Sequence, residues 1–399
     1  MGDVPAHWSL TPLGRVFRER KTTVSDKDYE PLSVSMNGVV PRMENVALTA
    51  NNDTRKLVRK GDYVINSRSD RKGSGGIAPR DGSVSVISTV LRPMGIEGRF
   101  AHHLLRSTAF QEEFYRWGSG IVADLWSTRY AAMSKITLPL PPVHEQRAIA
   151  DLLDRASAQI AVLIEKQNEL ITLLQEHRLS SINSILASAQ GAEGTPLRNV
   201  VTIQTGVTLG KSWDESTDLH EFPYLRVANV QTGRVDTENL TTIELPADVA
   251  KRSLLRPGDV LITEGGDRAA LARGSMWHGQ VDPCLHQNHI YALRPSKLLL
   301  GSYLVYVLEG SSARQYFERT RRQTTNLSAT NSSIVRAFRF TLPDLQDQET
   351  LVGRLDQETA QIDALIDKAT EHVALAQERR AALITAAVTG QLDITGKAA

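Results

Sequence analysis

The chain has 399 residues, of which 41% are hydrophobic and 23% charged, and its formal net charge is +1. This composition is typical of a globular protein with two or three domains, and it argues against a disordered chain or a uniformly basic coat for nucleic acid. No apolar run approaches the ~18 residues that a membrane helix needs, and the single cysteine, Cys284, excludes a framework of intrachain disulfides. We therefore expect a cytoplasmic protein without a membrane span.

Residues 1–142 are predicted to form a first globular domain of mixed α+β structure. Strands are expected at Tyr63–Ile65, directly after a Gly-Asp turn, and at Ser83–Leu91, before an Arg-Pro pair. A helix is expected at 101–117. Strands followed by a helix within one block predict an α+β unit.

Residues 143–190 are predicted to form one long helix. No glycine occurs between Gly120 and Gly191, and no proline between Pro142 and Pro196. Apolar residues recur at a heptad spacing, with extra apolar positions that widen the stripe beyond a two-stranded seam. With about 43 residues at 1.5 Å rise, the helix would be roughly 65 Å long. Its predicted helix-pair core residues are Ile149, Leu153, Ile160, Leu163, Leu170 and Leu174.

Residues 191–344 are predicted to form a second α+β domain. Strands are expected at Val260–Ile262, again after a Gly-Asp turn, and at His289–Leu293, again before an Arg-Pro pair. A helix is expected at 299–319. The same signals in the same order predict the same kind of domain.

Residues 345–390 are predicted to form a second long helix, because Pro343 is the last proline of the chain. Residues 391–399 are expected to be a C-terminal tail. The core residues of this helix are predicted to be Leu351, Leu355, Ile362 and Leu365. Segments 144–188 and 346–389 hold 14 acidic and 8 basic residues, whereas the rest of the chain holds 31 acidic and 38 basic residues. The helices are thus acidic and the two domains basic.

The second helix is a copy of the first. The segment Ala158–Lys166 recurs as Ala360–Lys368, and Leu91-Arg92-Pro93 recurs as Leu293-Arg294-Pro295, both at an offset of 202 residues. The chain is therefore built as domain, helix, domain, helix. An apolar stripe on so long a helix must be covered, either by another chain or by the second copy. Because one chain contains both copies, we predict that the two helices pair with each other and run antiparallel.

Two short glycine runs, Gly73–Gly76 and Gly265-Gly266, follow predicted strands. Neither has the helix and the downstream acid of a dinucleotide-binding unit. They are either plain surface loops or loops that let the backbone approach a groove of nucleic acid. In the second case the cations beside them are candidate DNA-binding residues, namely Arg68, Arg71, Lys72, Arg268 and Arg273.

Two further segments carry candidate DNA-binding residues. The segment Gly206–Ser212 resembles a phosphate-binding loop, but only three residues separate its glycines where such a loop needs four, which favours a turn that exposes Lys211. The segment Arg314–Asn326 is the densest in arginine and amides, which contact guanine, adenine and phosphates. It is either a solvated helix end or a DNA-binding segment. In the latter case its candidates are Arg321, Arg322, Gln323 and Asn326.

The sequence predicts no metal site and no catalytic residue. His286–His289 beside Cys284 is a cluster of ligand-type side chains, but no second cluster supports it, so a polar strand edge or a DNA contact is favoured. We find no Asn/Asp-Pro-Pro-aromatic motif of amino-methyltransferases, no Walker pair and no convincing set of nuclease carboxylates and lysine. The chain is therefore predicted not to be an enzyme.

The alternation of two domains with two copies of a long helix resembles the specificity subunit of type I restriction–modification systems. The resemblance spans essentially the whole chain. It departs at Leu342–Gln348, which lacks the double proline and the glutamate before glutamine, and in the absence of a tryptophan at the start of the second domain. The segments that carry it are Pro5–Trp8, Leu140–Gln146, Pro223–Val230, Arg256–Ile262 and His286–Asn288.

This resemblance implies a non-catalytic subunit. Each domain would be a target recognition domain for one half of a split double-stranded DNA sequence, and the helix pair would space the domains and dock two methyltransferase subunits. The methyltransferase subunits would carry S-adenosylmethionine. Separate restriction and translocase subunits, joined through the complex of two methyltransferase subunits with this chain, would use ATP and Mg²⁺, so this chain would bind no cofactor of its own.

The residues themselves agree with this interpretation. Because the two domains differ in sequence, their half-sites should differ, and a helix of roughly 65 Å covers at most about 19 base pairs. Two alternatives stay open. A coiled-coil scaffold that binds only proteins would show no salt-dependent DNA affinity, and a fused methyltransferase-endonuclease would methylate DNA without a second subunit.

Overall fold

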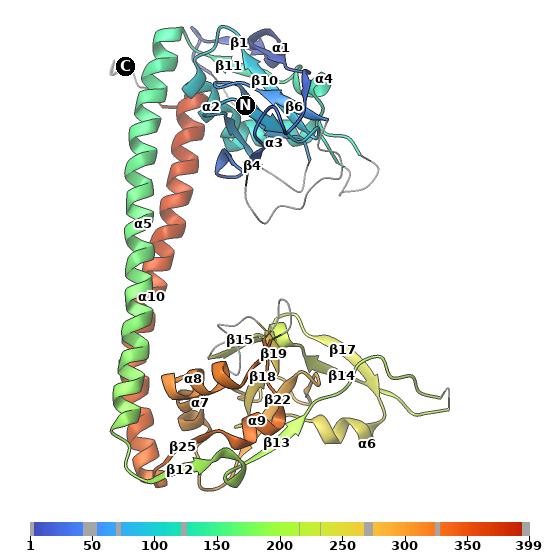
Figure 1. The fold of residues 1–399 in the computed structure, drawn as a ribbon, viewed down its shortest axis with the longest axis vertical. Coiled ribbons are helices and arrows are strands. Elements are labelled where there is room, and N and C mark those ends of the chain that lie inside the picture. The colour runs from blue at the N-terminus through green and yellow to red at the C-terminus, as the bar shows by residue number, and fades with distance from the viewer. Residues whose placement is uncertain are drawn as a thin grey trace. The chain divides into compact units, whose positions relative to one another are not determined.

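Figure 1 shows the computed structural model of the chain. It describes all residues except 1–3, 43–53, 69–72, 121–125, 215, 232, 267–273, 324–327 and 393–399. The chain divides into unit 1, which contains Met1–Asn168 and Thr370–Ala399, and unit 2, which contains Glu169–Ala369. Each unit consists of a strand-rich domain and part of both long helices.

The strand-rich domain of unit 1 is built on an antiparallel four-stranded sheet in the order β2-β10-β7-β8. The strands are β2 (Phe17–Glu19), β10 (Ser88–Pro93), β7 (Tyr63–Asn66) and β8 (Gly75–Ile77). A ribbon joins the beginning of the domain to its end and consists of β1 (Ser9–Pro12) and β11 (Thr137–Leu140). The remaining strands are β3 (Thr23–Val24), β4 (Leu32–Ser35), β5 (Gly38–Pro41), β6 (Arg55–Val58) and β9 (Gly82–Val84).

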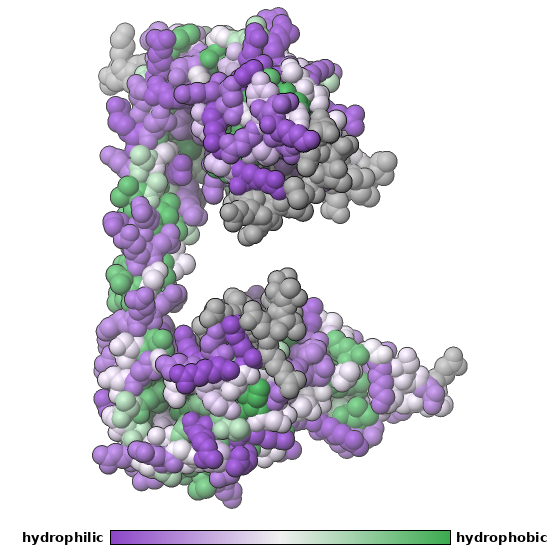
Figure 2. Space-filling view, in the orientation of Figure 1, coloured by the Kyte–Doolittle hydropathy of each residue, from purple (hydrophilic) through white to green (hydrophobic). Residues whose placement is uncertain are grey.

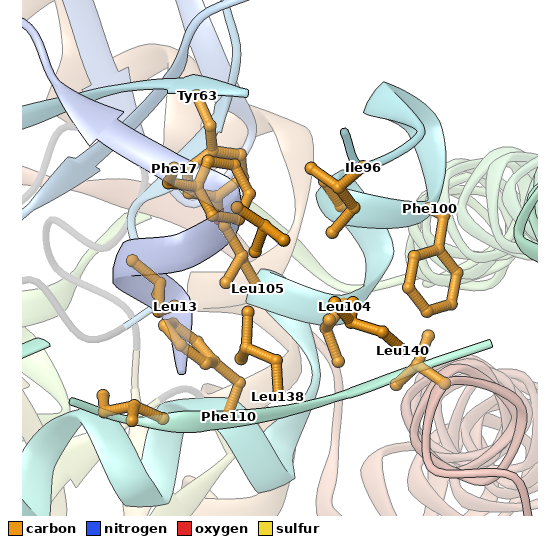
Figure 3. Close-up of a cluster of buried hydrophobic side chains, with 14 of the residues drawn as sticks. Leu13, Phe17, Tyr63, Ile96, Phe100, Leu104, Leu105, Phe110, Leu138 and Leu140 are labelled. Atoms are coloured by element: carbon orange, nitrogen blue, oxygen red, sulfur yellow. The ribbon is translucent and has the colours of Figure 1, made fainter. Parts of the chain in front are cut away.

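Helices cover one face of this sheet and close the main core of unit 1. They are α1 (Leu13–Val16), α2 (Gly98–Arg106), α3 (Thr108–Arg116) and α4 (Tyr130–Met133). Figure 3 shows Phe17 and Tyr63 from the sheet beside Leu104 and Phe110 from the helices. Their side chains are almost fully buried, and burying an aromatic or leucine side chain contributes about 1.5–3 kcal/mol.

The strand-rich domain of unit 2 repeats this plan. Its antiparallel four-stranded sheet has the order β13-β22-β18-β20, with strands β13 (Val201–Thr205), β22 (Ile290–Pro295), β18 (Val260–Thr263) and β20 (Ser275–Met276). Its ribbon pairs β12 (Ala192–Pro196) with β25 (Arg339–Leu342). Its helices are η3 (Leu197–Asn199), α7 (Gly301–Glu309), α8 (Ser311–Thr320) and α9 (Ser332–Ala337).

Unit 2 also contains further small elements. A second sheet consists of β17 (Thr241–Leu245), β14 (His220–Leu225) and β21 (Leu285–His286), and a third of β19 (Gly265–Gly266), β24 (Ser328–Ala329) and β23 (Arg322–Gln323). The others are β15 (Val230–Gln231), β16 (Arg234–Val235), η4 (Val227–Asn229), η5 (Lys251–Ser253) and α6 (Ala247–Ala250).

The register of the two main sheets matches residue by residue. Thr89 of β10 pairs with Ile65 of β7 as Tyr291 of β22 pairs with Ile262 of β18. In the same way Leu91 pairs with Glu19 of β2, and Leu293 pairs with Ile203 of β13. The sequence repeat is therefore a repeat of structure, and positions in one unit have defined equivalents in the other.

The two long helices are α5 (Val143–Ala187) and α10 (Leu345–Val388), drawn in green and red in Figure 1. In unit 1, Ile149 and Leu153 of α5 share a buried cluster with Ala387 and Val388 of α10. In unit 2, the end of α5 meets the beginning of α10, because Ile182 shares a cluster with Leu351 and Leu355. The predicted antiparallel pairing is therefore confirmed. Within the described residues, no helix is apolar enough over a sufficient length to span a bilayer.

The predicted helix-pair core is only partly correct. Ile149, Leu153, Leu351, Leu355 and Ile362 are buried, and Ile160 and Leu174 are half-buried. The prediction is wrong for Leu163, Leu170 and Leu365, whose exposed fractions are 48%, 43% and 53%. The apolar stripe is wider than the contact between the helices, and two alanines, Ala369 and Ala376, occupy buried positions instead.

Three predicted elements are each divided in two. The expected strand at 83–91 is interrupted by a turn in which Ser88 N donates to Ser85 O, so β9 and β10 are separate. The helices expected at 101–117 and 299–319 break at Ser107 and Gly310, both with extended backbone. The Ser107 hydroxyl accepts from Phe110 N at 3.2 Å and caps α3. The strands expected at Tyr63–Ile65, Val260–Ile262 and His289–Leu293 are confirmed within a residue or two.

Candidate nucleic-acid interface

A small sheet in unit 2 brings two of the predicted DNA-binding segments together. Gly265 and Gly266 of β19 pair with Ala329 and Ser328 of β24, which pair in turn with β23. β23 consists of Arg322 and Gln323, whose backbone is described but whose side chains are not. The glycine run and the segment rich in arginine and amides therefore belong to the same three-stranded sheet, with β24 between them.

Unit 1 holds the equivalent arrangement in a reduced form. Ser127 bridges both Arg68, which follows β7, and Ser119, which follows α3. Below this bridge Thr128 N donates to Ser67 O at 2.9 Å, as Thr330 N donates to Glu264 O at 2.7 Å in unit 2. The same backbone contact therefore joins two loops in both domains. One loop follows β7 in unit 1 and β18 in unit 2, and the other follows α3 in unit 1 and α8 in unit 2.

Five of the predicted DNA-binding residues, Arg71, Lys72, Arg268, Arg273 and Asn326, lie outside the described residues. Arg68 is exposed, and its backbone N donates to Asn66 Oδ1 at 3.1 Å. Arg321 is different, because its side chain is only 18% exposed and lies 3.3 Å from Glu318 in an ion pair. Lys211 is exposed, and its ammonium lies 4.4 Å from the ring centre of Trp213.

The loop before Lys211 has a structural reason for its first glycine. A Cβ at Gly206 would lie 2.0 Å from His286 O, and Val207 N donates to the same carbonyl at 2.8 Å. The glycine therefore allows two backbone segments to touch, and this contact, rather than a phosphate, explains the motif.

The histidine-rich segment is split between the core and the surface. His286 is fully buried, its Nδ1 lies 2.9 Å from Ile290 O, and burial lowers its pKa to about 4. Burial raises the pKa of Cys284 to about 12. Across the described parts of the chain no three residues of His, Cys, Asp or Glu are grouped as metal ligands would be.

His289, by contrast, is exposed and belongs to a chain of polar contacts. Its Nδ1 lies 2.7 Å from Glu264 Oε2, and Tyr291 Oη donates to Glu264 Oε1 at 2.8 Å. Burial and the neighbouring carboxylate raise the pKa of Tyr291. This carboxylate lies beside β19, at the candidate interface of unit 2.

A cleft of about 560 Å³ occupies the equivalent place in unit 1, where Ser67 and Thr89 stand at the positions of Glu264 and Tyr291. Among the residues that line it are four cations and one carboxylate, namely Lys21, Lys56, Arg68, Arg129 and Glu19. The structure thus adds three cations that sequence reasoning missed. They lie on separate short elements with no shared motif, and the nearest signal is the short charged run 18–21.

The Gly-Asp turns that mark the repeat have a structural role. Gly61 and Gly258 have positive φ values of 87° and 92°. Asp62 and Asp259, which follow them, are buried and accept hydrogen bonds from the backbone three residues earlier and from an arginine side chain. The hydrogen bond to Asp62 raises the pKa of Arg20. These aspartates are therefore not free for catalysis.

A buried glutamine fastens each domain to the beginning of its long helix. Gln146 Oε1 accepts from Glu97 N, and its Nε2 donates to Pro141 O, both at 2.8 Å. Gln348 makes the same contacts, accepting from Leu300 N at 2.8 Å and donating to Pro343 O at 2.9 Å. These hydrogen bonds, rather than DNA, explain the glutamine that both copies share.

The missing tryptophan and the missing glutamate of the second copy are one feature. In unit 1, Trp8 Nε1 donates to Glu145 Oε2 at 3.0 Å, and His7 Nε2 lies 3.0 Å from Glu145 Oε1. The second domain has neither the tryptophan nor the glutamate. Because each is the partner of the other, both are absent together.

Unit 2 also contains a cleft of about 860 Å³ between α7 and the long helices. Arg178 crosses it, since its Nε donates to Asp363 Oδ1 at 2.7 Å and its Nη1 donates to Glu309. The side chains that line the cleft include four cationic or imidazole groups and four carboxylates. The cleft therefore has no excess of either charge that would select a polyanion.

Comparisons with known proteins agree with this architecture. No protein-family model matches the chain. The chain is 22% identical over 432 aligned positions to the type I restriction enzyme EcoKI specificity subunit of Escherichia coli K12, covering 100% of this chain and 92% of that protein. It is 21% identical to the StySPI specificity subunit of Salmonella potsdam, with the same coverage.

A solved structure shows the same fold. It comes from a study of complex assembly and conformational transition in the type I R-M system, and it matches with a TM-score of 0.71 at 20% identity over 98% of this chain and 100% of that one. The α+β fold with two long helices is therefore that of a known structure. Along its whole length the chain is similar to type I restriction enzyme specificity subunits, which confirms the resemblance seen in its sequence.

Proposed function

We propose that this chain confers sequence specificity on a type I restriction–modification complex, with residues 1–142 and 191–344 as target recognition domains that each contact one part of a two-part duplex DNA target. The observation that carries the proposal is the duplicated sheet, which has the same strand order and register in both units and different side chains at the candidate interface. Two domains with the same backbone fold and different surface side chains support a DNA target whose two parts differ in sequence. Residues 143–190 and 345–390 serve as spacers.

The helices also support the docking of two methyltransferase subunits. Several large apolar side chains on the helices are between 43% and 61% exposed, and Figure 2 shows hydrophobic side chains on the visible face of both helices. In unit 1 they are Val162, Leu163 and Leu375, and in unit 2 Leu170, Leu173 and Leu365. Exposed apolar patches of this kind are typical of protein interfaces.

The cofactors of the reaction belong to the partners under this proposal. S-adenosylmethionine is held by the methyltransferase subunits, and ATP with Mg²⁺ by the restriction and translocase subunits, which join through the methyltransferase complex. This chain contributes the recognition surfaces and the frame. Methylation by the chain alone would contradict the proposal, as would a cellular location away from cytoplasmic DNA.

Sequencing of methylated adenines tests the proposal directly. The chain is expressed with its methyltransferase subunits in a host free of adenine methylation, and the expected motif has two different parts separated by a gap of fixed length. Exchange of residues 1–142 for those of a relative should change one part and leave the other. A single continuous motif, or a change in both parts, would contradict the two-domain assignment.

The salt dependence of DNA binding distinguishes the proposed function from a scaffold that binds only proteins. DNA binding that neutralises phosphates weakens steeply as salt rises, because condensed counterions are released on binding. The full chain with its partners should show this dependence. The same affinity with and without this chain would support the scaffold instead.

A further inference from the structure

The cations of the unit 1 cleft come from four separate segments of the chain. Lys21 follows β2, Lys56 belongs to β6, Arg68 follows β7, and Arg129 directly precedes α4. Folding places them around one cleft of about 560 Å³. Bringing like charges together costs free energy unless anions compensate them.

The carboxylate in the cleft compensates only part of this charge. Glu19 lies 3.6 Å from both Lys21 Nζ and Lys56 Nζ, and Lys56 Nζ also donates to Ser88 O at 2.8 Å. Within the described residues, the side chains of Arg68 and Arg129 make no ion pair, and both residues are exposed. The cleft therefore holds a net positive charge on groups that face solvent.

The lining of the cleft indicates an extended phosphate ligand. Its exposed apolar part is Val86 and Ile87, and the hydroxyl of its one aromatic residue, Tyr130, donates to Phe17 O. Nothing among the described lining residues encloses a base as a nucleotide pocket would. The exposed Lys21, Arg68 and Arg129 along an open cleft suit the backbone of a nucleic acid, which is contacted mainly by such cations.

Unit 2 lacks the positive charge at the positions equivalent to Lys21 and Arg129. The sheet register places Thr205 where unit 1 has Lys21, and Asn331 precedes α9 where Arg129 precedes α4. The position of Ser67 is taken by Glu264, whose carboxylate contacts His289 and Tyr291. The two candidate surfaces therefore differ in electrostatics.

We propose that the unit 1 cleft binds the phosphodiester backbone of duplex DNA through Lys21, Lys56, Arg68 and Arg129. This inference rests on the proposed DNA-recognition function. It specifies which residues contact the DNA backbone independently of the base sequence.

The test measures binding of the full-length chain to a short DNA duplex of random sequence at several salt concentrations. The variant Lys21→Met/Arg129→Met removes two exposed cations of the cleft, and its matched control Arg15→Met/Lys135→Met removes two exposed cations of the same unit outside the cleft. The slope of log K against log salt should become shallower by about 2 in the first variant, since each phosphate contact contributes about 0.9. In the control the slope should stay unchanged.

The possible outcomes separate the two proposals. If the wild-type chain binds no DNA at any salt, even with its methyltransferase subunits present, the proposed function itself fails. If it binds and both variants shift the slope equally, or neither does, the cleft is not the phosphate site. Stronger cleft-dependent binding to an RNA duplex of the same sequence would also overturn it. Should the double variant not fold, as judged by circular dichroism, Arg68→Met alone should make the slope shallower by about 1.

Discussion

His286 illustrates how a motif suggestive of chemistry can belong to the core. Its Nδ1–H donates to Ile290 O, whereas its Nε2 has no hydrogen-bond partner among the described residues. An unsatisfied buried polar atom is costly, and protonation would add a buried charge. The native state therefore holds this imidazole neutral, which agrees with its low pKa of about 4.

This histidine makes stability sensitive to acid. In the unfolded chain an imidazole titrates near pH 6.5, so between about pH 6.5 and pH 4 the unfolded chain binds a proton that the native chain does not. The free energy of unfolding should fall as pH is lowered through this window, by at most about 3 kcal/mol for His286. Urea unfolding of wild-type and His286→Gln chains at about pH 7.5 and pH 5 checks this. The variant should lose less stability than wild type, and equal losses would contradict the assignment.

Only some of the individual residues of the candidate interface could be predicted from the sequence. Arg68 could be found because it stands beside a glycine run after a strand, and the structure places it in the cationic cleft. Lys21, Lys56 and Arg129 could not, since their relation arises from the packing of separate elements. Arg321 was predicted as a DNA-binding residue from the local excess of arginine. That excess does not reveal that Arg321 lies 3.3 Å from Glu318 in an ion pair.

At the scale of elements, α5 and α10 were the most predictable part of the fold. Both helices lack proline, α5 also lacks glycine, and α10 contains the single glycine Gly353, so these long periodic segments leave few alternatives to a helix. Both begin directly after a proline or within two residues of one. The breaks at Ser107 and Gly310 were not predicted, because the apolar pattern continues across them. The small sheet of β19, β24 and β23 was also missed, since two-residue strands carry no periodicity.

The exposed leucines of the helices give a prediction for partner binding. Changing Leu170, Leu173 and Leu365 to serine should reduce co-purification of the methyltransferase subunits, while the Tm of the chain alone should change little, because exposed side chains contribute little to folding.

Two single substitutions are its controls. Leu298→Ser, at a residue of unit 2 that is 61% exposed and outside the helices, should leave co-purification intact. Leu355→Ala, at a fully buried residue, should lower the free energy of unfolding by about 2–5 kcal/mol. If the methyltransferase subunits still co-purify fully with the triple variant, these leucines do not belong to the docking surface.

For the whole molecule, the internal repeat was the most informative signal in the sequence. The offset of 202 residues predicted two equivalent domains and an antiparallel helix pair, and both are present. The repeat could not show how the copies diverged. The basic cleft of unit 1 and the Glu264–His289–Tyr291 contacts of unit 2 occupy equivalent positions with opposite charge, which depends on side chains that no pattern of hydrophobicity records.

The proposed spacer role of the helices predicts a change in the gap of the DNA target. Deletion of residues 164–167 from α5 together with 370–373 from α10 shortens each helix by about 6 Å, which is slightly more than one full turn. The gap in the methylated motif should shorten by about 2 base pairs. Deletion from one helix alone should abolish methylation, because the apolar residues would lose register. An unchanged gap in the double deletion would contradict the spacer role.

The order in which the units are completed during synthesis follows from how the chain is divided. Unit 2 is one continuous stretch, whereas unit 1 needs residues 370–399 in addition to its first 168 residues. Ala387 and Val388, which close the cluster around Ile149 and Leu153, leave the ribosome only after all of unit 2 has been translated. The nascent first half must therefore wait with part of its apolar surface uncovered, while the second half already has every residue it needs to fold.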